Sequence, residues 1–216
     1  MAQGINRVGA LAKAFEFIYK SEIDGDYHEY GVYQGVSIAR ALRENLSWQR
    51  KSNRNHVKNF FGFDSFQGLP IFTENDRLAD YKIFHEGQFS DTSTDIVRKK
   101  ILEEGLSVDN VELIEGMFSK TLSDSNVITK IGDSRVAIAH IDCDLYSSAM
   151  DCLKFLDGRL ADGAVLLFDD WYCYRGRPDC GVNKAFVEWQ DGQRYHVSDY
   201  FNYSWAGRAF IVNSQD

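Results

Sequence analysis

The feature that most constrains the fold of this chain is a regular alternation between short apolar runs and segments with helical spacing. Apolar runs that predict buried strands are KNFFGFD (58–64), NVELIEG (110–116), RVAIAHID (135–142) and GAVLLFDD (163–170). Helical patterns occupy residues 5–20, 36–46, 92–105, 147–160 and 179–191. Because strands that alternate with helices tend to pair in parallel, this order predicts an α/β fold with helices on both faces of a mostly parallel sheet.

The remaining segments refine this prediction. Two strand-like runs, near 194–200 and 207–213, leave no room for a long helix between them, so we expect an antiparallel hairpin at the sheet edge. Residues 118–126 predict a short helix at most. The irregular segment 65–91 is long for a plain connection and predicts a lid or substrate loop. A length of 216 residues suits a single domain over 1–216, with an N-terminal helix within 1–22.

Composition excludes several classes of protein. Hydrophobic residues make up 44% and charged residues 26%, which is enough apolar surface for a sizeable core. The net charge of −8 and the sequence pI of about 5.1 disfavour binding to phosphate backbones, so we expect no nucleic-acid partner. The basic stretch 50–54 is too short to change this and is interpreted as a solvated loop.

The four cysteines predict reduced thiols rather than a disulfide framework. Cys143, Cys152, Cys173 and Cys180 form no C-x-x-C pair, and a chain of this size does not need a disulfide scaffold. The sequence shows neither a signal-peptide pattern nor a run of about 18 apolar residues. We therefore expect a cytoplasmic protein with no membrane partner.

Residues 24–35 (DGDYHEYGVYQG) predict a turn, a short strand and a glycine-containing loop, ahead of the apolar run 58–64. Residues 29–35 read E-x-G-x-x-x-G, and Gly31 and Gly35 allow a tight turn and a close approach of a ligand. Ser37 is expected to cap the helix that follows. The pattern is not G-x-G-x-x-G, so a dinucleotide pyrophosphate site is poorly supported, and an ordinary βα turn remains an alternative.

Two further positions suit a nucleoside. Asp64 ends the next predicted strand, where an acidic side chain can accept hydrogen bonds from both hydroxyls of a ribose. A turn or helix-capping aspartate is the alternative interpretation. Gly116-Met117-Phe118 follows another strand, at a location that suits the adenine of a nucleoside cofactor.

Carboxylates end two consecutive strands. Asp142 and Asp144 follow one apolar run and, if extended, would point to the same face at roughly 6–7 Å from each other. Asp169-Asp170 ends the next strand. Four carboxylates at the mouths of neighbouring strands repel each other unless a cation neutralises them, and Mg²⁺ prefers such oxygen ligands. Solvated loop carboxylates are the alternative.

The histidines carry less information. His85 falls in the presumed lid and is interpreted as a surface or loop-packing residue, and His140 as a buried histidine with satisfied hydrogen bonds. No G-x-S-x-G pattern is present, which disfavours a serine hydrolase.

Five segments together resemble the macrocin O-methyltransferase (TylF-like) family. They are EYGVYQGVS, FDSFQGLP, EGMFSKTL, IDCDLYSS and LLFDDWY, and the resemblance covers about residues 24–190. It implies a Rossmann-like class I methyltransferase fold, with a seven-stranded, mostly parallel sheet and an antiparallel edge strand. It also implies S-adenosylmethionine, Mg²⁺, and methylation of a hydroxyl on a small molecule, a sugar or a glycosylated natural product.

The resemblance also implies roles for individual residues. The cofactor would be bordered by Glu29, Gly31, Gly35, Ser37, Asp64, Gly116, Phe118 and Asp142. Asp142, Asp169 and Asp170 would hold the metal, and Asp144, next to Asp142, would be the general base or a partner of the metal ligands. The region before the glycine loop is short compared with that of antibiotic-tailoring members, where it helps to cover the active site.

Other functions stay open at this point. A metal-dependent glycosyltransferase would use the D-x-D of 142–144 to hold a nucleotide sugar. A non-catalytic nucleoside-binding protein would share the scaffold, since fold alone does not prove activity. A methyltransferase for a catechol-like phenol is less favoured, because Asp144 stands where a lysine base is expected in catechol enzymes. Self-association into a homo-oligomer is compatible with the aromatic-rich tail.

Overall fold

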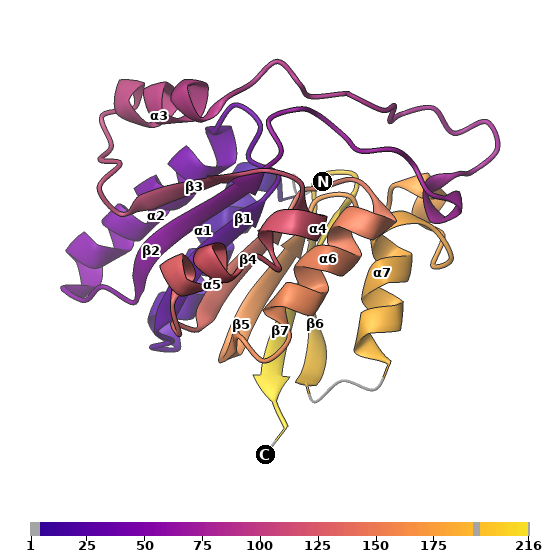
Figure 1. The fold of residues 1–216 in the computed structure, drawn as a ribbon. Helices are drawn as coiled ribbons and strands as arrows, with labels where there is room; N and C mark the ends of the chain where they lie inside the picture. The colour runs from indigo at the N-terminus through magenta and orange to yellow at the C-terminus, as the bar shows by residue number, and fades with distance from the viewer. Residues whose placement is uncertain (1–4, 192–194, 216) are drawn as a thin grey trace.

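The structure is a computed structural model that describes residues 5–191 and 195–215, and it consists of one sheet between two layers of helices (Figure 1). The sheet has seven strands in the order β3-β2-β1-β4-β5-β7-β6. Their bounds are Gly25–Tyr30 (β1), Val57–Asp64 (β2), Val111–Glu115 (β3), Val136–Ile141 (β4), Leu160–Phe168 (β5), Tyr195–Tyr203 (β6) and Gly207–Ser214 (β7). This sheet confirms the predicted α/β class.

Strands β1 to β5 pair in parallel, as the alternation with helices predicted. The last two strands form the expected hairpin, in which β7 pairs antiparallel with β5 on one side and with β6 on the other. Because the turn between β6 and β7 is short, β7 must run back beside β6 (Figure 1). Strand β7 therefore runs opposite to the other strands of the sheet.

Each face of the sheet is covered by its own helices. One layer contains α1 (Arg7–Lys20), α2 (Val36–Ser52) and α3 (Thr94–Glu103). The other contains α4 (Phe118–Thr121), α5 (Ser125–Ile131), α6 (Tyr146–Leu156) and α7 (Gly181–Gln190). Phe15 and Ile38 are fully buried in the first core, and Leu153 in the second. The parallel strands read as continuous apolar runs because both of their faces are covered.

Two local expectations were wrong. Residues 118–131 form two helices rather than one short helix, and α5 was missed although Asp124 caps it and Gly132 ends it. The basic stretch 50–54 is not all loop, because α2 continues to Ser52 and ends at Asn53, whose φ is 56°. The side chains of this stretch are nevertheless exposed to solvent, as expected.

The segment 65–91 leaves β2, crosses the top of the sheet and returns to α3 (Figure 1). A 3₁₀ turn, η1 (Glu74–Asp76), anchors its middle on the helices of the second layer. Asp76 accepts a hydrogen bond from the backbone N–H of Tyr146 at 2.5 Å, and Lys184 donates one to Asn75 at 2.7 Å. The segment is therefore long and irregular but tied to α6 and α7 above the strand ends.

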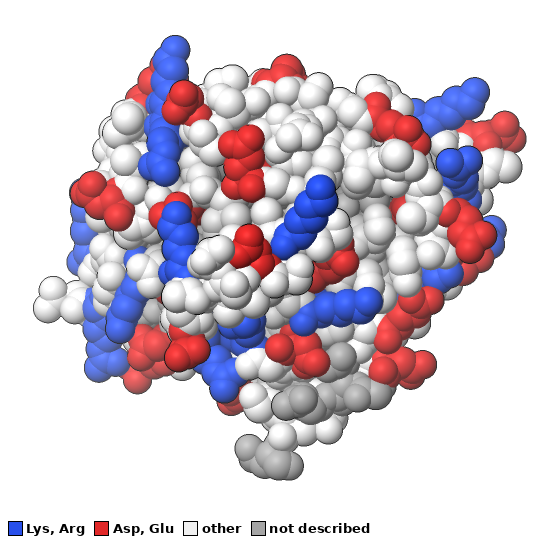
Figure 2. Space-filling view, viewed as in Figure 1, with Lys and Arg blue, Asp and Glu red and all other residues white. Residues whose placement is uncertain are grey.

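The four cysteine thiols are free and buried, in agreement with the predicted reduced state. Among the helices of the described residues, none has the length and apolar character that crossing a bilayer requires. On the face drawn in Figure 2, acidic and basic side chains are interspersed among uncharged ones.

Candidate active site

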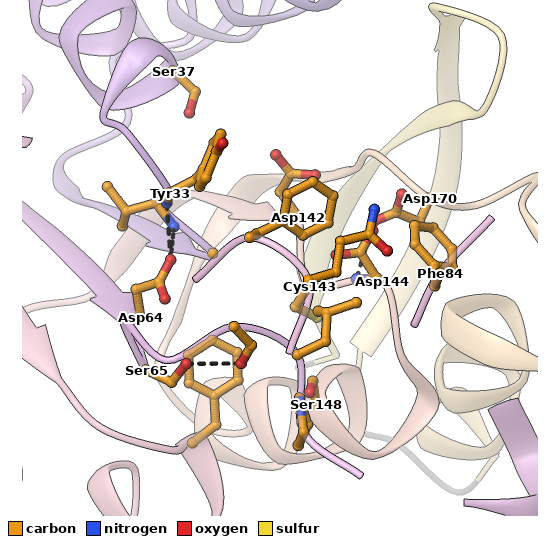
Figure 3. A pocket seen from close by; sticks show the side chains of 18 of the residues that line it. Tyr33, Ser37, Asp64, Ser65, Phe84, Asp142, Cys143, Asp144, Ser148 and Asp170 are labelled. Carbon is orange, nitrogen blue, oxygen red and sulfur yellow. Dashed lines mark hydrogen bonds between the residues drawn. The ribbon is translucent and has the colours of Figure 1, made fainter. Parts of the chain in front are cut away.

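A cavity of about 1010 Å³ opens at the carboxyl ends of the parallel strands. This is the edge at which doubly wound sheets bind their ligands. Its walls come from the start of α1, the glycine loop and the first turns of α2, Asp64 and the segment 65–91, residues 117–119 and residues 142–151, with Asp170, Cys173 and Trp205 completing the lining. Figure 3 shows Asp64 on one side of this cavity and Asp144 and Asp170 on the other, with Asp142 between them.

The glycine loop is held against the end of β4. A side chain at Gly31, whose φ is 94°, would overlap the carbonyl oxygen of Asp142, and the Asp142 N–H donates to Tyr30 at 2.9 Å. Gly35, at φ 82°, begins α2 and lies against Val97 of α3. The glycines therefore permit close approach of the protein's own backbone. Gly31 lines the cavity, whereas Gly35 lies behind it.

Asp64 organises this loop from β2. Its Oδ2 accepts hydrogen bonds from the N–H groups of Val32 and Tyr33, each at 2.8 Å, and its Oδ1 accepts one from Phe66 at 2.8 Å (Figure 3). The turn interpretation of Asp64 is thus confirmed. Asp64 also lines the cavity, and a carboxylate has about four acceptor positions, so a ribose contact remains available and remains a prediction.

Ser37 does not cap α2, contrary to expectation, because Gly35 occupies the N-cap without a side-chain hydrogen bond. Its hydroxyl instead donates to Glu29 Oε1 at 2.7 Å. Glu29 is fully buried beneath the loop, and Tyr27 donates to its other oxygen. Ser37 lines the cavity and Glu29 does not, so Glu29 supports the loop from below.

The segment after β3 forms another wall of the cavity. Phe118 lines the cavity and packs edge-on against Tyr30, with ring centroids 6.1 Å apart. Gly116 has φ 135°, and a side chain there would meet Thr121 at 2.7 Å. Gly116 therefore shapes the turn that presents Met117 and Phe118 to the cavity.

The carboxylates gather on the other side, as predicted, because β4 and β5 are neighbours and Asp169 N–H donates to Ile141 at 3.1 Å. The expectation that Asp142 and Asp144 share one face of an extended strand was wrong. Strand β4 ends at Ile141, and Asp144 has a φ of 63°. Asp142, Asp144 and Asp170 line the cavity, whereas Asp169 lies beneath it with 2% of its side chain exposed.

Among the described residues, His140, Asp142 and Asp169 form a group of possible metal ligands in which each offers one atom within 4.8 Å of the others, and the predicted ligand Asp170 is not part of it. His140 is buried and its Nε2 lies 2.8 Å from Asp169 Oδ1, which confirms the interpretation of a satisfied buried histidine. Asp170 lies beside Asp144, whose N–H donates to Asp170 Oδ2 at 3.1 Å. His85, by contrast, is exposed outside the cavity lining.

Arg7 is a residue of this site that the sequence did not indicate. It is the first residue of α1, and its guanidinium forms ion pairs with Asp142, at 3.3 Å from Nη1 to Oδ2, and with Asp169 through Nε. These partners lie more than 130 residues away along the chain, so no spacing pattern relates them to Arg7. A lone arginine at the start of an amphipathic helix resembles any solvated residue.

The charges of the site are unevenly compensated. Burial, together with the charge of Asp169, raises the pKa of Asp142 well above its usual range. Burial and the charge of Asp170 do the same to the pKa of Asp144. The pKa of Asp170 rises to about 6 through burial and the charge of Asp169. Burial would also raise the pKa of Asp169, but His140 and Arg7 lower it.

The fold is the one found in class I methyltransferases. The structure of the O-methyltransferase NovP matches this chain with a TM-score of 0.72 and 21% identity, over 95% of this chain and 78% of NovP. The calicheamicin methyltransferase CalS11 matches with a TM-score of 0.72 and 18% identity, over 94% of this chain and 77% of CalS11.

Comparison with related sequences identifies the protein family of this chain. Mycinamicin III 3''-O-methyltransferase of Micromonospora griseorubida is 28% identical over 200 residues, which is 91% of this chain and 71% of the relative. The 8-demethyl-8-(2,3-dimethoxy-alpha-L-rhamnosyl)-tetracenomycin-C 4'-O-methyltransferase of Streptomyces olivaceus is 27% identical over 188 residues, 81% of this chain and 67% of the relative. The model of the macrocin-O-methyltransferase (TylF) family matches residues 1–193. The chain belongs to this family, and thereby to the O-methyltransferases.

Proposed function

We propose that this protein transfers a methyl group from S-adenosylmethionine to a hydroxyl of a sugar or a glycosylated small molecule, with the help of Mg²⁺. One observation carries the proposal: a single cavity joins a glycine loop anchored on Asp64 to a cluster of buried carboxylates. Family membership supports the methyl transfer. The names of the two relatives above, one a rhamnosyl compound methyltransferase, support a glycosylated acceptor.

The cofactor is assigned to the half of the cavity formed by the glycine loop, Asp64 and Phe118. Asp64 already accepts three hydrogen bonds from the loop, so it would accept one from a ribose hydroxyl through the position that is left. Gly31, Ser37 and Asp142 would border the methionine part, with Glu29 and Gly35 supporting the loop. Phe118, presented by the turn at Gly116, would offer an aromatic ring to the adenine.

The other half of the cavity suits a hard cation. Asp142, Asp144 and Asp170 have raised pKa values because they are buried beside other carboxylates, and a cation relieves that repulsion. Carboxylate oxygens are the ligands that Mg²⁺ prefers. Asp142, Asp169 and Asp170 would hold it, and His140 would orient Asp169 through the 2.8 Å contact.

When bound, S-adenosylmethionine supplies an electrophilic methyl group on sulfur, and Mg²⁺ supplies a positive charge that lowers the pKa of the acceptor hydroxyl. Asp144 takes the hydroxyl proton, because its carboxylate lines the cavity beside Asp170, on the side where the acceptor hydroxyl would bind the cation. Methyl transfer from the bound cofactor would give a methyl ether and S-adenosylhomocysteine, with the acceptor proton held on Asp144. The cavity walls align the two reactants.

Calorimetric titration of the metal-stripped protein with S-adenosylhomocysteine, and then with Mg²⁺, tests this proposal. We expect nucleoside affinity of about micromolar order, and weaker metal binding in Asp142→Asn than in the exposed control Asp133→Asn. Methyl transfer to hydroxylated sugars is then followed by mass spectrometry. A protein that binds a sugar nucleotide but not S-adenosylhomocysteine would support the glycosyltransferase alternative and overturn the proposal.

A further inference from the structure

Arg7 approaches the same oxygen atoms that the metal would need. Asp169 Oδ1 already receives the Tyr203 hydroxyl at 2.5 Å and lies 2.8 Å from His140 Nε2. Its other oxygen, Oδ2, is the one that Arg7 contacts. Both oxygens of Asp142 also face the guanidinium, at 3.4 Å from Nη2 to Oδ1 and 3.3 Å from Nη1 to Oδ2. Among the described residues, the arginine therefore contacts the oxygen atoms of Asp142 and Asp169 that receive no other side-chain hydrogen bond.

The backbone around Arg7 is well anchored. Asn6 caps α1 by accepting a hydrogen bond from Gly9 N–H, and Ile5 O accepts one from Ser204 N–H at 2.6 Å. Phe17, further along α1, packs against Tyr200 of β6. These contacts hold the start of α1 beside the turn between β6 and β7, so the folded chain brings Arg7 to the carboxylates.

The side chain of Arg7 has room to leave. It is 53% exposed, lines the cavity and is long and flexible. A guanidinium and a divalent cation on the same carboxylate oxygens would repel each other. Without either cation, the buried Oδ2 of Asp169 and the largely buried carboxylate of Asp142 would lose their positive partner, which is unfavourable.

We propose that Arg7 is an internal counter-cation that competes with a divalent cation for Asp142 and Asp169. Metal binding displaces its guanidinium into the cavity, and metal loss brings it back. Arg7 thereby stabilises the metal-free protein and weakens the apparent metal affinity. This inference rests on the proposed metal site.

The test is Mn²⁺ binding to the metal-stripped protein, measured from the electron paramagnetic resonance of free Mn²⁺. We expect Arg7→Gln to bind Mn²⁺ about tenfold more tightly than the wild type, because charge-assisted hydrogen bonds no longer have to be broken. Arg7→Lys keeps the charge but not the fork of donors, and should bind with intermediate affinity. Arg43→Gln is the matched control, since Arg43 is a half-exposed arginine paired with Glu104 away from the cavity.

Thermal unfolding provides a second readout. Arg7→Gln should melt at a lower temperature than the wild type without metal, and this difference should disappear at saturating Mn²⁺. Equal or weaker Mn²⁺ binding in both Arg7 variants would overturn the competition and leave the proposed metal site standing. Absence of Mn²⁺ binding in the wild type and in every variant would overturn both, and loss of binding in Asp142→Asn confirms that the measured site is this one.

Discussion

His140 Nε2 lies 2.8 Å from Asp169 Oδ1, and the other ring nitrogen of His140 lies 3.5 Å from Glu29 Oε2 beneath the glycine loop. One buried imidazole thus connects the support of the cofactor loop with the carboxylate cluster. Glu29 in turn accepts a hydrogen bond from Ser37, which faces the cavity. The two halves of the site therefore share a buried polar network, whose members must all be paired to be stable.

Removing His140 should destabilise the protein strongly. His140→Phe leaves Asp169 and Glu29 buried with fewer donors, so we expect a loss of about 3 kcal/mol in the free energy of unfolding, measured by urea denaturation. The exposed His85→Gln should change it by less than about 0.5 kcal/mol. Equal stabilities of the two variants would contradict this role of His140.

Replacing Gly31 tests the contact between the glycine loop and β4. Gly31→Ala places a methyl group on the Asp142 carbonyl at a φ of 94°, so we expect a loss of about 3 kcal/mol or more and weaker S-adenosylhomocysteine binding. Gly105 also has a positive φ, of 71°, at the end of α3, where Leu106 N–H donates to Ile101, and nothing lies within 4 Å of an added side chain. Gly105→Ala should therefore lose only about 1 kcal/mol, and a similar loss in both variants would rule out the steric explanation.

The metal-free protein should lose stability as the pH rises from about 4 to 6. The pKa of Asp170 is about 6 in the folded protein and about 3.9 in an unfolded chain. The folded state therefore binds more protons in this window, and the free energy of unfolding should fall by up to about 3 kcal/mol across it. Urea denaturation in a chelator should show this fall in the wild type and in Asp133→Asn, and a smaller one in Asp170→Asn. A wild-type profile that rises throughout would refute the assignment.

Asp144→Asn should abolish most of the turnover without affecting cofactor binding. The amide cannot accept the acceptor proton, so we expect kcat to fall by about 10² to 10⁴-fold. Calorimetry should show S-adenosylhomocysteine affinity within about twofold of the wild type, because Asp144 lies on the carboxylate side of the cavity. Wild-type turnover in this variant would assign the base elsewhere.

Trp205 should contribute to acceptor binding. It is 67% exposed and lines the cavity from the turn between β6 and β7, where an aromatic face can pack against a sugar ring. We expect Trp205→Ala to raise KM for the acceptor about tenfold and to leave S-adenosylhomocysteine affinity unchanged. Leu102→Ala, an exposed apolar residue outside the cavity lining, is the control. An unchanged KM would remove Trp205 from the acceptor site.

Local patterns in the sequence were sufficient for most of the fold. The apolar runs that became β2, β4 and β5 and the helical spacing of α1, α2 and α6 depend on neighbouring residues alone, so their order predicted the parallel sheet. The carboxylate cluster followed from the same reasoning, because parallel strands end at one edge. Where two short helices followed each other, at α4 and α5, the periodicity was too brief to separate them.

The sequence by itself determined the α/β class, the family and the positions of the glycine loop and the four aspartates, since each is written in a short contiguous stretch. Only the tertiary structure decided how these groups are compensated. It turned Asp144 out of the strand at a positive φ, directed Ser37 to Glu29 instead of the helix end, and brought Arg7 onto Asp142 and Asp169. Charge compensation depends on which distant segments pack together, and that arrangement follows from burial of the whole core rather than from any local pattern.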